Sequence, residues 1–129
     1  MARKNTLVTP LTINHSLSAS FTTTPTVVRY LDNCSYQINI TTSDSTGTFD
    51  VEVSNDYYVN EGNDNVVMNP GNWTALTLAG GTPTVSASND TIVINLNQLP
   101  FYAVRLHYLS SVAGTGTCSI YIADKQIGG

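Results

Sequence analysis

Cys34-Ser-Tyr-Gln-Ile-Asn-Ile-Thr41 is the stretch that decides the fold, because apolar and polar residues alternate along its whole length. In an extended strand, successive side chains point to opposite faces of the sheet. A period of two therefore predicts a half-buried β-strand. Its buried face carries Cys34, Tyr36, Ile38 and Ile40.

The same period recurs along most of the chain, and helical periodicity appears nowhere. Clear strands are expected at Thr48–Ser54, Thr91–Leu96, Phe101–Leu109 and Thr117–Ala123. Weaker ones are expected at Ser16–Phe21, Thr26–Leu31, Val66–Met68, Trp73–Leu78 and Thr84–Ser86. About eight short strands at this spacing predict an all-β sandwich or barrel, and two antiparallel sheets packed face to face would bury the apolar positions.

The N-terminal stretch differs from the rest, because its periodicity is weak and it contains Arg3, Lys4 and Pro10. We expect an extended arm over residues 1–15, followed by a single β-sandwich domain over residues 16–129. Arg3 and Lys4 are the candidate contacts of that arm with an acidic neighbour. Farther along, the polar turn Ser43–Gly47 suits a hairpin between the two strands that it joins.

The composition excludes several functions. Only 11% of the 129 residues are charged, against roughly 25% in a typical soluble protein. The net charge is −4 and the few cations are scattered, so nucleic acid is not an expected partner. No apolar run has the length of a membrane span or of a signal peptide, so we expect neither a membrane partner nor export from the cytoplasm.

Few residues are suited to chemistry. His15 and His107 are the only histidines, and no serine lies in a nucleophile-elbow pattern. We therefore expect no enzyme, no catalytic residue, no metal and no cofactor. Cys34 and Cys118 cannot form a metal site alone. Both lie on apolar strand faces, which favours buried free thiols, with a Cys34–Cys118 disulfide as the alternative.

A long loop at Asn55–Asn72 is the candidate binding region, since loops of this length in compact domains are often functional. Aromatic rings beside carboxylates suit stacking on sugars and also anchor protein interfaces. Tyr57 and Tyr58 are adjacent, so one is expected to point inward and the other outward. The candidate contacts with a partner or a glycan are Asp56, Tyr57, Tyr58, Glu61 and Asp64.

Two further side chains have expected structural roles. Trp73 begins a strand, which favours packing in the core over exposure. Arg105 interrupts an apolar strand, and a structural ion pair with a nearby carboxylate is favoured over a role as an interface anchor.

Four stretches in order carry a resemblance to a known group. They are Gly47-Thr-Phe-Asp-Val-Glu-Val-Ser-Asn-Asp56, Asn72-Trp-Thr-Ala-Leu76, Ile94-Asn-Leu-Asn-Gln-Leu-Pro-Phe-Tyr-Ala-Val-Arg-Leu106 and Gly114-Thr-Gly-Thr-Cys-Ser-Ile-Tyr-Ile122. This order resembles small structural proteins of tailed bacteriophages, over roughly residues 34–125. The middle part is also similar to discoidin-type jelly-roll modules.

The resemblance implies a jelly-roll-like virion protein without catalytic residues. We expect a capsid decoration protein that binds the major capsid protein, or other virion proteins, as a homo-oligomer, with a trimer as the expected form. The alternative is a carbohydrate-binding module of a head or tail fibre, in which the Asn55–Asn72 loop holds the sugar.

Overall fold

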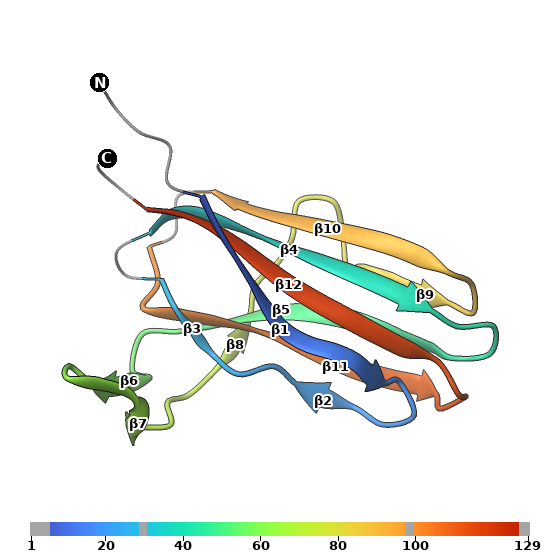
Figure 1. The fold of residues 1–129 in the computed structure, drawn as a ribbon, viewed down its shortest axis with the longest axis horizontal. Coiled ribbons are helices and arrows are strands. Elements are labelled where there is room, and N and C mark those ends of the chain that lie inside the picture. The colour runs from blue at the N-terminus through green and yellow to red at the C-terminus, as the bar shows by residue number, and fades with distance from the viewer. Residues whose placement is uncertain (1–5, 29–30, 98–99, 127–129) are drawn as a thin grey trace.

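The computed structural model describes residues 6–28, 31–97 and 100–126, and within them every regular element is a β-strand (Figure 1). One antiparallel sheet has the order β1 (Thr6–Ser16), β12 (Thr117–Gln126), β4 (Leu31–Thr41) and β10 (Asp90–Asn97). The other has β2 (Phe21–Thr22) and β3 (Thr26–Val27) on β11 (Ala103–Val112), then β5 (Thr46–Ser54), then β8 (Thr74–Ala75) and β9 (Thr84–Ser86). A separate hairpin joins β6 (Tyr58–Asn60) to β7 (Asn63–Asn69).

The connectivity is that of a jelly roll. Because β2 and β3 both pair with β11, and β8 and β9 both pair with β5, the ten strands of the two sheets act as eight. Along the chain these eight alternate between the sheets, except that β5 and β8–β9 follow one another in the same sheet. Eight strands wound in this way form the double-sheet jelly roll, which confirms the predicted fold class.

The core lies between the two sheets and is made by the inward positions of the alternating strands. Phe49, Val51, Ile38 and Ile120 are fully buried, and Phe49 packs against Tyr108 with 4.9 Å between ring centroids. The predicted inward faces of β4, β5, β10, β11 and β12 are therefore confirmed. Burial of these apolar side chains is the main force that holds the two sheets together.

The expected N-terminal arm is wrong from Thr6 onward. Residues Thr6–Ser16 form β1, which pairs with β12 along its length. The predicted strand Ser16–Phe21 is therefore wrong, because Leu17–Ser20 form the bend between β1 and β2. β1 has weak periodicity because it is an edge strand with Pro10 and two register shifts, so only Leu11 packs on the core from its middle. Arg3 and Lys4 lie outside the described residues.

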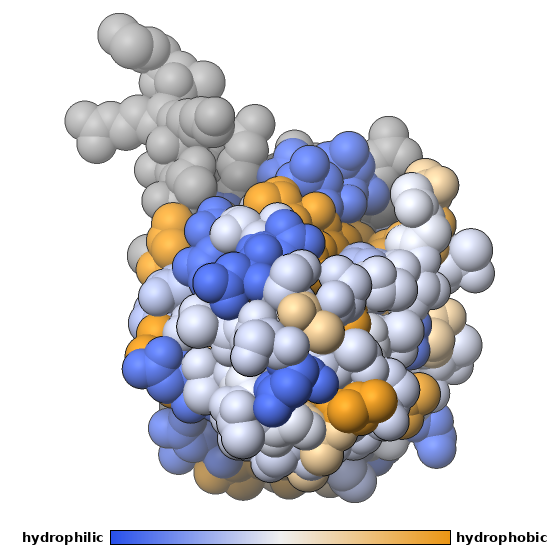
Figure 2. Space-filling model, turned by 90° about the vertical axis from the view of Figure 1, so that its right-hand side faces the viewer, coloured by the Kyte–Doolittle hydropathy of each residue, from blue (hydrophilic) through white to orange (hydrophobic). Residues whose placement is uncertain are grey.

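The expected hairpin between β4 and β5 is also wrong, because these strands belong to different sheets. Their turn crosses from one sheet to the other and is tied to the β11–β12 turn. The Asp44 carboxylate accepts the Thr115 amide at 2.9 Å, and Ser45 Oγ donates to the Ala113 carbonyl at 2.8 Å. Gly114 completes this contact with φ +59°, a conformation that favours glycine. Figure 2 looks onto this end of the molecule, which is mostly pale with scattered hydrophilic and hydrophobic residues.

Cys34 and Cys118 are buried free thiols, which confirms the first of the two sequence-based alternatives. On the paired strands Cys118 lies opposite Ile40 and Cys34 lies opposite Asp124. Six residues of strand, from 118 to 124, therefore separate the two cysteines. That is roughly 20 Å, far beyond the reach of a disulfide.

Both thiols are expected to resist modification in the native protein. Burial raises the pKa of Cys34 to about 12 and that of Cys118 to about 11, so the reactive thiolate is scarce at about pH 8. An aromatic disulfide reagent should therefore react with both only as fast as the protein unfolds, and quickly in denaturant. A burst of one thiol equivalent from the native protein would contradict this expectation.

Candidate interaction surfaces

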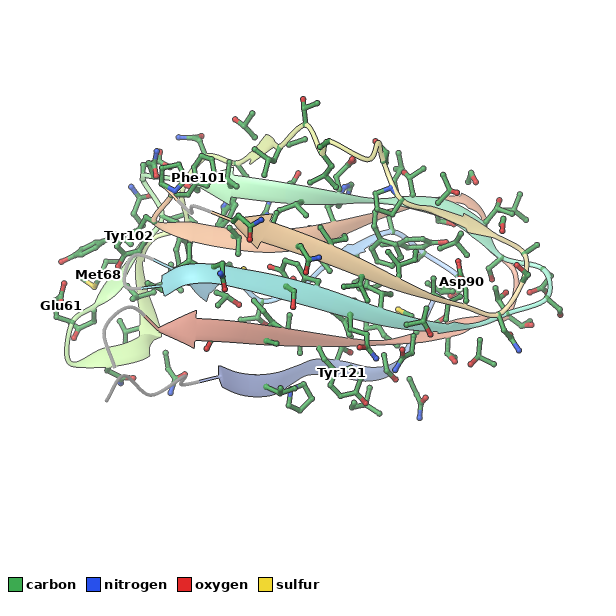
Figure 3. All side chains as sticks on the ribbon, turned by 90° about the horizontal axis from the view of Figure 1, so that it is seen from above. Glu61, Met68, Asp90, Phe101, Tyr102 and Tyr121 are labelled. Atoms are coloured by element: carbon green, nitrogen blue, oxygen red, sulfur yellow. The ribbon has the colours of Figure 1, made fainter. Side chains whose placement is uncertain are left out.

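The predicted Asn55–Asn72 loop is a β-hairpin rather than an irregular loop. β6 and β7 project from one end of the sandwich, opposite the end that carries the β4–β5 turn (Figure 1). We call the exposed apolar side chains of this element the hairpin surface, defined by Tyr58, Val66, Val67 and Met68. Their exposed fractions run from 43% to 55%, so none of the four is needed for the core. Figure 3 shows Met68 and Glu61 at the outer end of the molecule, far from Asp90.

The base of the hairpin is braced by Asp56. Its carboxylate accepts hydrogen bonds from Ser54 Oγ, the Asn72 amide and Asn72 Nδ2, each at 2.8 Å. Asn72 follows β7, so these bonds fasten the two ends of the hairpin to each other. The backbone hydrogen bond from Asn72 is the largest of the effects that lower the pKa of Asp56.

A packed stack supports the hairpin from the side of the larger sheet. Tyr57 is 6% exposed and packs on Trp73, with 5.5 Å between ring centroids. The Arg105 guanidinium lies 4.3 Å from the Trp73 ring centroid and makes an ion pair of 2.7 Å with Glu52. A cation over an indole ring is a favourable contact, strengthened here by partial burial. The hairpin is thus fixed to the body by a rigid base.

The structure separates the five candidate contacts of the loop. Tyr58 and Glu61 are exposed, whereas Tyr57 is buried, which confirms that the adjacent tyrosines point in opposite directions. The carboxylate of Asp56 is engaged within the fold. Asp64 lies in β7, and its side chain is outside the described part of the structure.

The structural roles expected of two other residues are confirmed. Arg105 makes its ion pair with Glu52, directly opposite it on β5, and Trp73 packs partly buried against a second small core of Tyr57, Val59 and Ala103.

Protonation of Asp56 is expected to loosen the hairpin. Because its pKa is lower in the folded protein than in the unfolded chain, its stabilising effect is complete above the unfolded value of about 3.9 and is lost as the pH falls through the folded value. The Asp56→Asn variant should therefore lose less stability than the wild type between about pH 6 and pH 2.5. Denaturant midpoints across this range would measure the difference, and parallel curves would contradict it.

A second candidate surface is a hollow of about 320 Å³ on the outer face of the four-stranded sheet. Its lining is neutral and combines aliphatic, amide, hydroxyl and phenol groups from all four strands. Gln37 Nε2 donates to Asn39 Oδ1 at 3.2 Å, so the two amide side chains of the lining hold each other in position. The alternation of Cys34–Thr41 predicts that Ser35, Gln37 and Asn39 share a face, but the hollow also depends on the order of the neighbouring strands, which alternation does not give. It is lined by Val8, Ser35, Gln37, Asn39, Val93, Tyr121 and Ala123.

Within residues 6–28, 31–97 and 100–126, no three His, Cys, Asp or Glu side chains come together as a metal site would require. The described part of the chain also has no helix of the length and apolarity needed to cross a membrane.

Comparison with known proteins gives a fold neighbour. No family model and no curated protein matches this sequence. Among solved structures, the chain is similar to the crystal structure of the SPBc2 prophage-derived protein YomS, with a TM-score of 0.59 and 11% sequence identity. The match covers 98% of this chain and 97% of that one, so the whole domain, β1 included, has a counterpart of the same fold.

Proposed function

We propose that this protein is a non-enzymatic structural protein of a bacteriophage virion. It decorates the capsid as a homo-oligomer and binds the major capsid protein through the hairpin surface. The order of its sequence motifs, which resembles small phage structural proteins, and the prophage origin of a protein with the same fold both support a phage role.

The single observation that carries the proposal is the exposed apolar character of a braced hairpin. Four of the nine large apolar side chains that are exposed in the described part of the chain lie together on this one projecting hairpin: Tyr58, Val66, Val67 and Met68. Apolar side chains that gather on one exposed element are typical of interaction sites. Aliphatic side chains and methionine match the apolar core of a protein interface better than a sugar, which offers mainly hydroxyl groups.

The proposal is tested by sedimenting the purified protein with capsids of the phage that encodes it. We expect saturable binding, with a stoichiometry in simple proportion to the major capsid protein, and a higher temperature of capsid disruption when the protein is bound. Capsids that lack the gene product provide the free sites. Absence of the protein both from sedimented capsids and from purified virions would overturn the proposal.

A glycan-binding role is the second candidate, and the neutral hollow on the four-stranded sheet is the observation that favours it. Tyr121, Gln37 and Asn39 offer a ring and amides to a saccharide, without a charge among the lining residues. Binding to a glycan array that is lost in a Gln37→Ala, Tyr121→Ala variant would support this role. Capsid binding by that same variant at the wild-type level would exclude the hollow from the capsid contact.

A further inference from the structure

The two long edges of the four-stranded sheet differ. β1, at one edge, contains Pro10, which has no amide hydrogen, and its pairing with β12 shifts register twice. Asn14 within it has φ +51°. Proline and bulges are the devices by which proteins prevent other strands from adding to a sheet. This edge is therefore blunted.

β10, at the other edge, has none of these devices. Its eight residues pair with β4 in uninterrupted register, from Asp90 opposite Ile40 to Asn97 opposite Asn33. It contains no proline, lysine or arginine, and its one charge, Asp90, lies at the start. In the other sheet, β2 and β3 share one edge and β8 and β9 share the other. Each of these strands has only two or three residues, too few for another strand to pair with over a long stretch.

In the described residues no strand pairs with the outward side of β10. The Thr91 amide donates to the Asp90 carboxylate at 2.8 Å, so it points away from β4. In-plane directions alternate along a strand, so the amides of Val93 and Asn95 point the same way. Beside Val93–Asn95, the loop from Leu78 to Pro83 leaves a groove of about 290 Å³. Gly80 and Gly81 in that loop face open space.

We infer that two copies of this chain pair antiparallel through β10 and join their four-stranded sheets into one sheet. The occupant of the edge is a second copy because the strand is complementary to itself. Directly opposed residues of an antiparallel pair point to the same face, so the two-fold axis must pass through a residue rather than between two. With the axis at Val93, Ile92 lies opposite Ile94 of the second copy and Thr91 lies opposite its Asn95.

This register is favoured by burial and by charge. Val93 is 57% exposed in the single chain, and the axis places it against Val93 of the second copy, where both valines lose contact with water. The two Asp90 carboxylates lie at opposite ends of the paired strands and do not meet. A ring of three copies joined edge to edge would need β10 to add to β1, which is blunted, so strand pairing favours a two-fold dimer over the expected trimer.

This inference deepens the proposed function, because it assigns the self-contact of the homo-oligomer. Its test uses the purified full chain without capsids, so a failure of capsid binding would leave it standing. Light scattering during size exclusion is expected to give twice the chain mass of 13.8 kDa at roughly 100 µM protein, well above a micromolar dissociation constant. Val93→Pro, which removes an outward amide, is expected to give the monomer mass with an unchanged β-sheet circular dichroism spectrum.

Cysteine pairs test the register directly, since Cys34 and Cys118 are buried and give no background. Val93→Cys is expected to form a disulfide-linked dimer under mild oxidation, at least tenfold faster than Val8→Cys. Val8 is a matched control because it lies on the same sheet at the blunted edge and is 60% exposed. A mixture of Thr91→Cys and Asn95→Cys should cross-link, whereas each alone should not. A monomeric wild type, equal rates for Val93→Cys and Val8→Cys, or rapid cross-linking by Asn95→Cys alone would overturn the inference.

Discussion

Phe49→Ala is expected to lower the free energy of unfolding by about 3–5 kcal/mol, which is a large part of the total stability of an ordinary domain. Phe49 lies in the middle of β5 and is fully buried, with its ring against Tyr108. Truncation removes the buried ring and leaves a cavity that two hydrogen-bonded sheets can close only in part. Equilibrium unfolding in urea measures the change.

Val112→Ala is the matched control for this variant. Val112 lies at the end of β11 and is 53% exposed, so its truncation is expected to change stability by less than about 0.5 kcal/mol. A similar loss in both variants would contradict the placement of Phe49 at the centre of a shared interior.

The strands that the sequence predicts best are those with one buried face and one solvent-exposed face. Phe49, Ile38 and Ile120 are identified by their period of two alone, because each belongs to a strand whose opposite face meets water. β1 could not be predicted in this way. It is an edge strand with Pro10 and two register shifts, so it keeps only part of an alternating pattern, and its sequence is therefore interpreted as an extended arm.

Alternation also cannot say which strands are neighbours. The spacing between β4 and β5 is compatible with a hairpin within one sheet or with a crossing between two sheets, and the structure has the crossing. The sequence also does not show that β1 and β10 are the two edge strands of one sheet, one blunted and one not, because that depends on the order of strands in the sheet.

In the candidate binding region, some features follow from the sequence and others do not. The inward and outward orientations of Tyr57 and Tyr58 follow from their adjacency, and the ion pair of Arg105 follows from a charge in an apolar strand. The bracing role of Asp56 does not follow, because its partner Asn72 is sixteen residues away and is brought back only by the β6–β7 hairpin.

The two proposed surfaces are compatible with each other. The hairpin surface lies at one end of the sandwich, whereas β10 runs along its side (Figure 1). Antiparallel pairing of β10 would point the two hairpins in opposite directions. Such a dimer could contact two capsid proteins at once, and the second contact would be strengthened by the high effective concentration that the first creates.

Met68→Asp and Val67→Asp are each expected to weaken capsid binding at least tenfold, which corresponds to about 1.4 kcal/mol. At 55% and 50% exposure, neither side chain supports the fold, so the unfolding midpoint should stay close to the wild-type value. A carboxylate at the centre of an apolar contact would have to lose its water without a partner. Val112→Asp, equally exposed at the other end of the sandwich, is the control and should bind like the wild type. If both hairpin variants bind capsids normally while Val112→Asp does not, the contact lies at the turn end of the jelly roll instead of the hairpin.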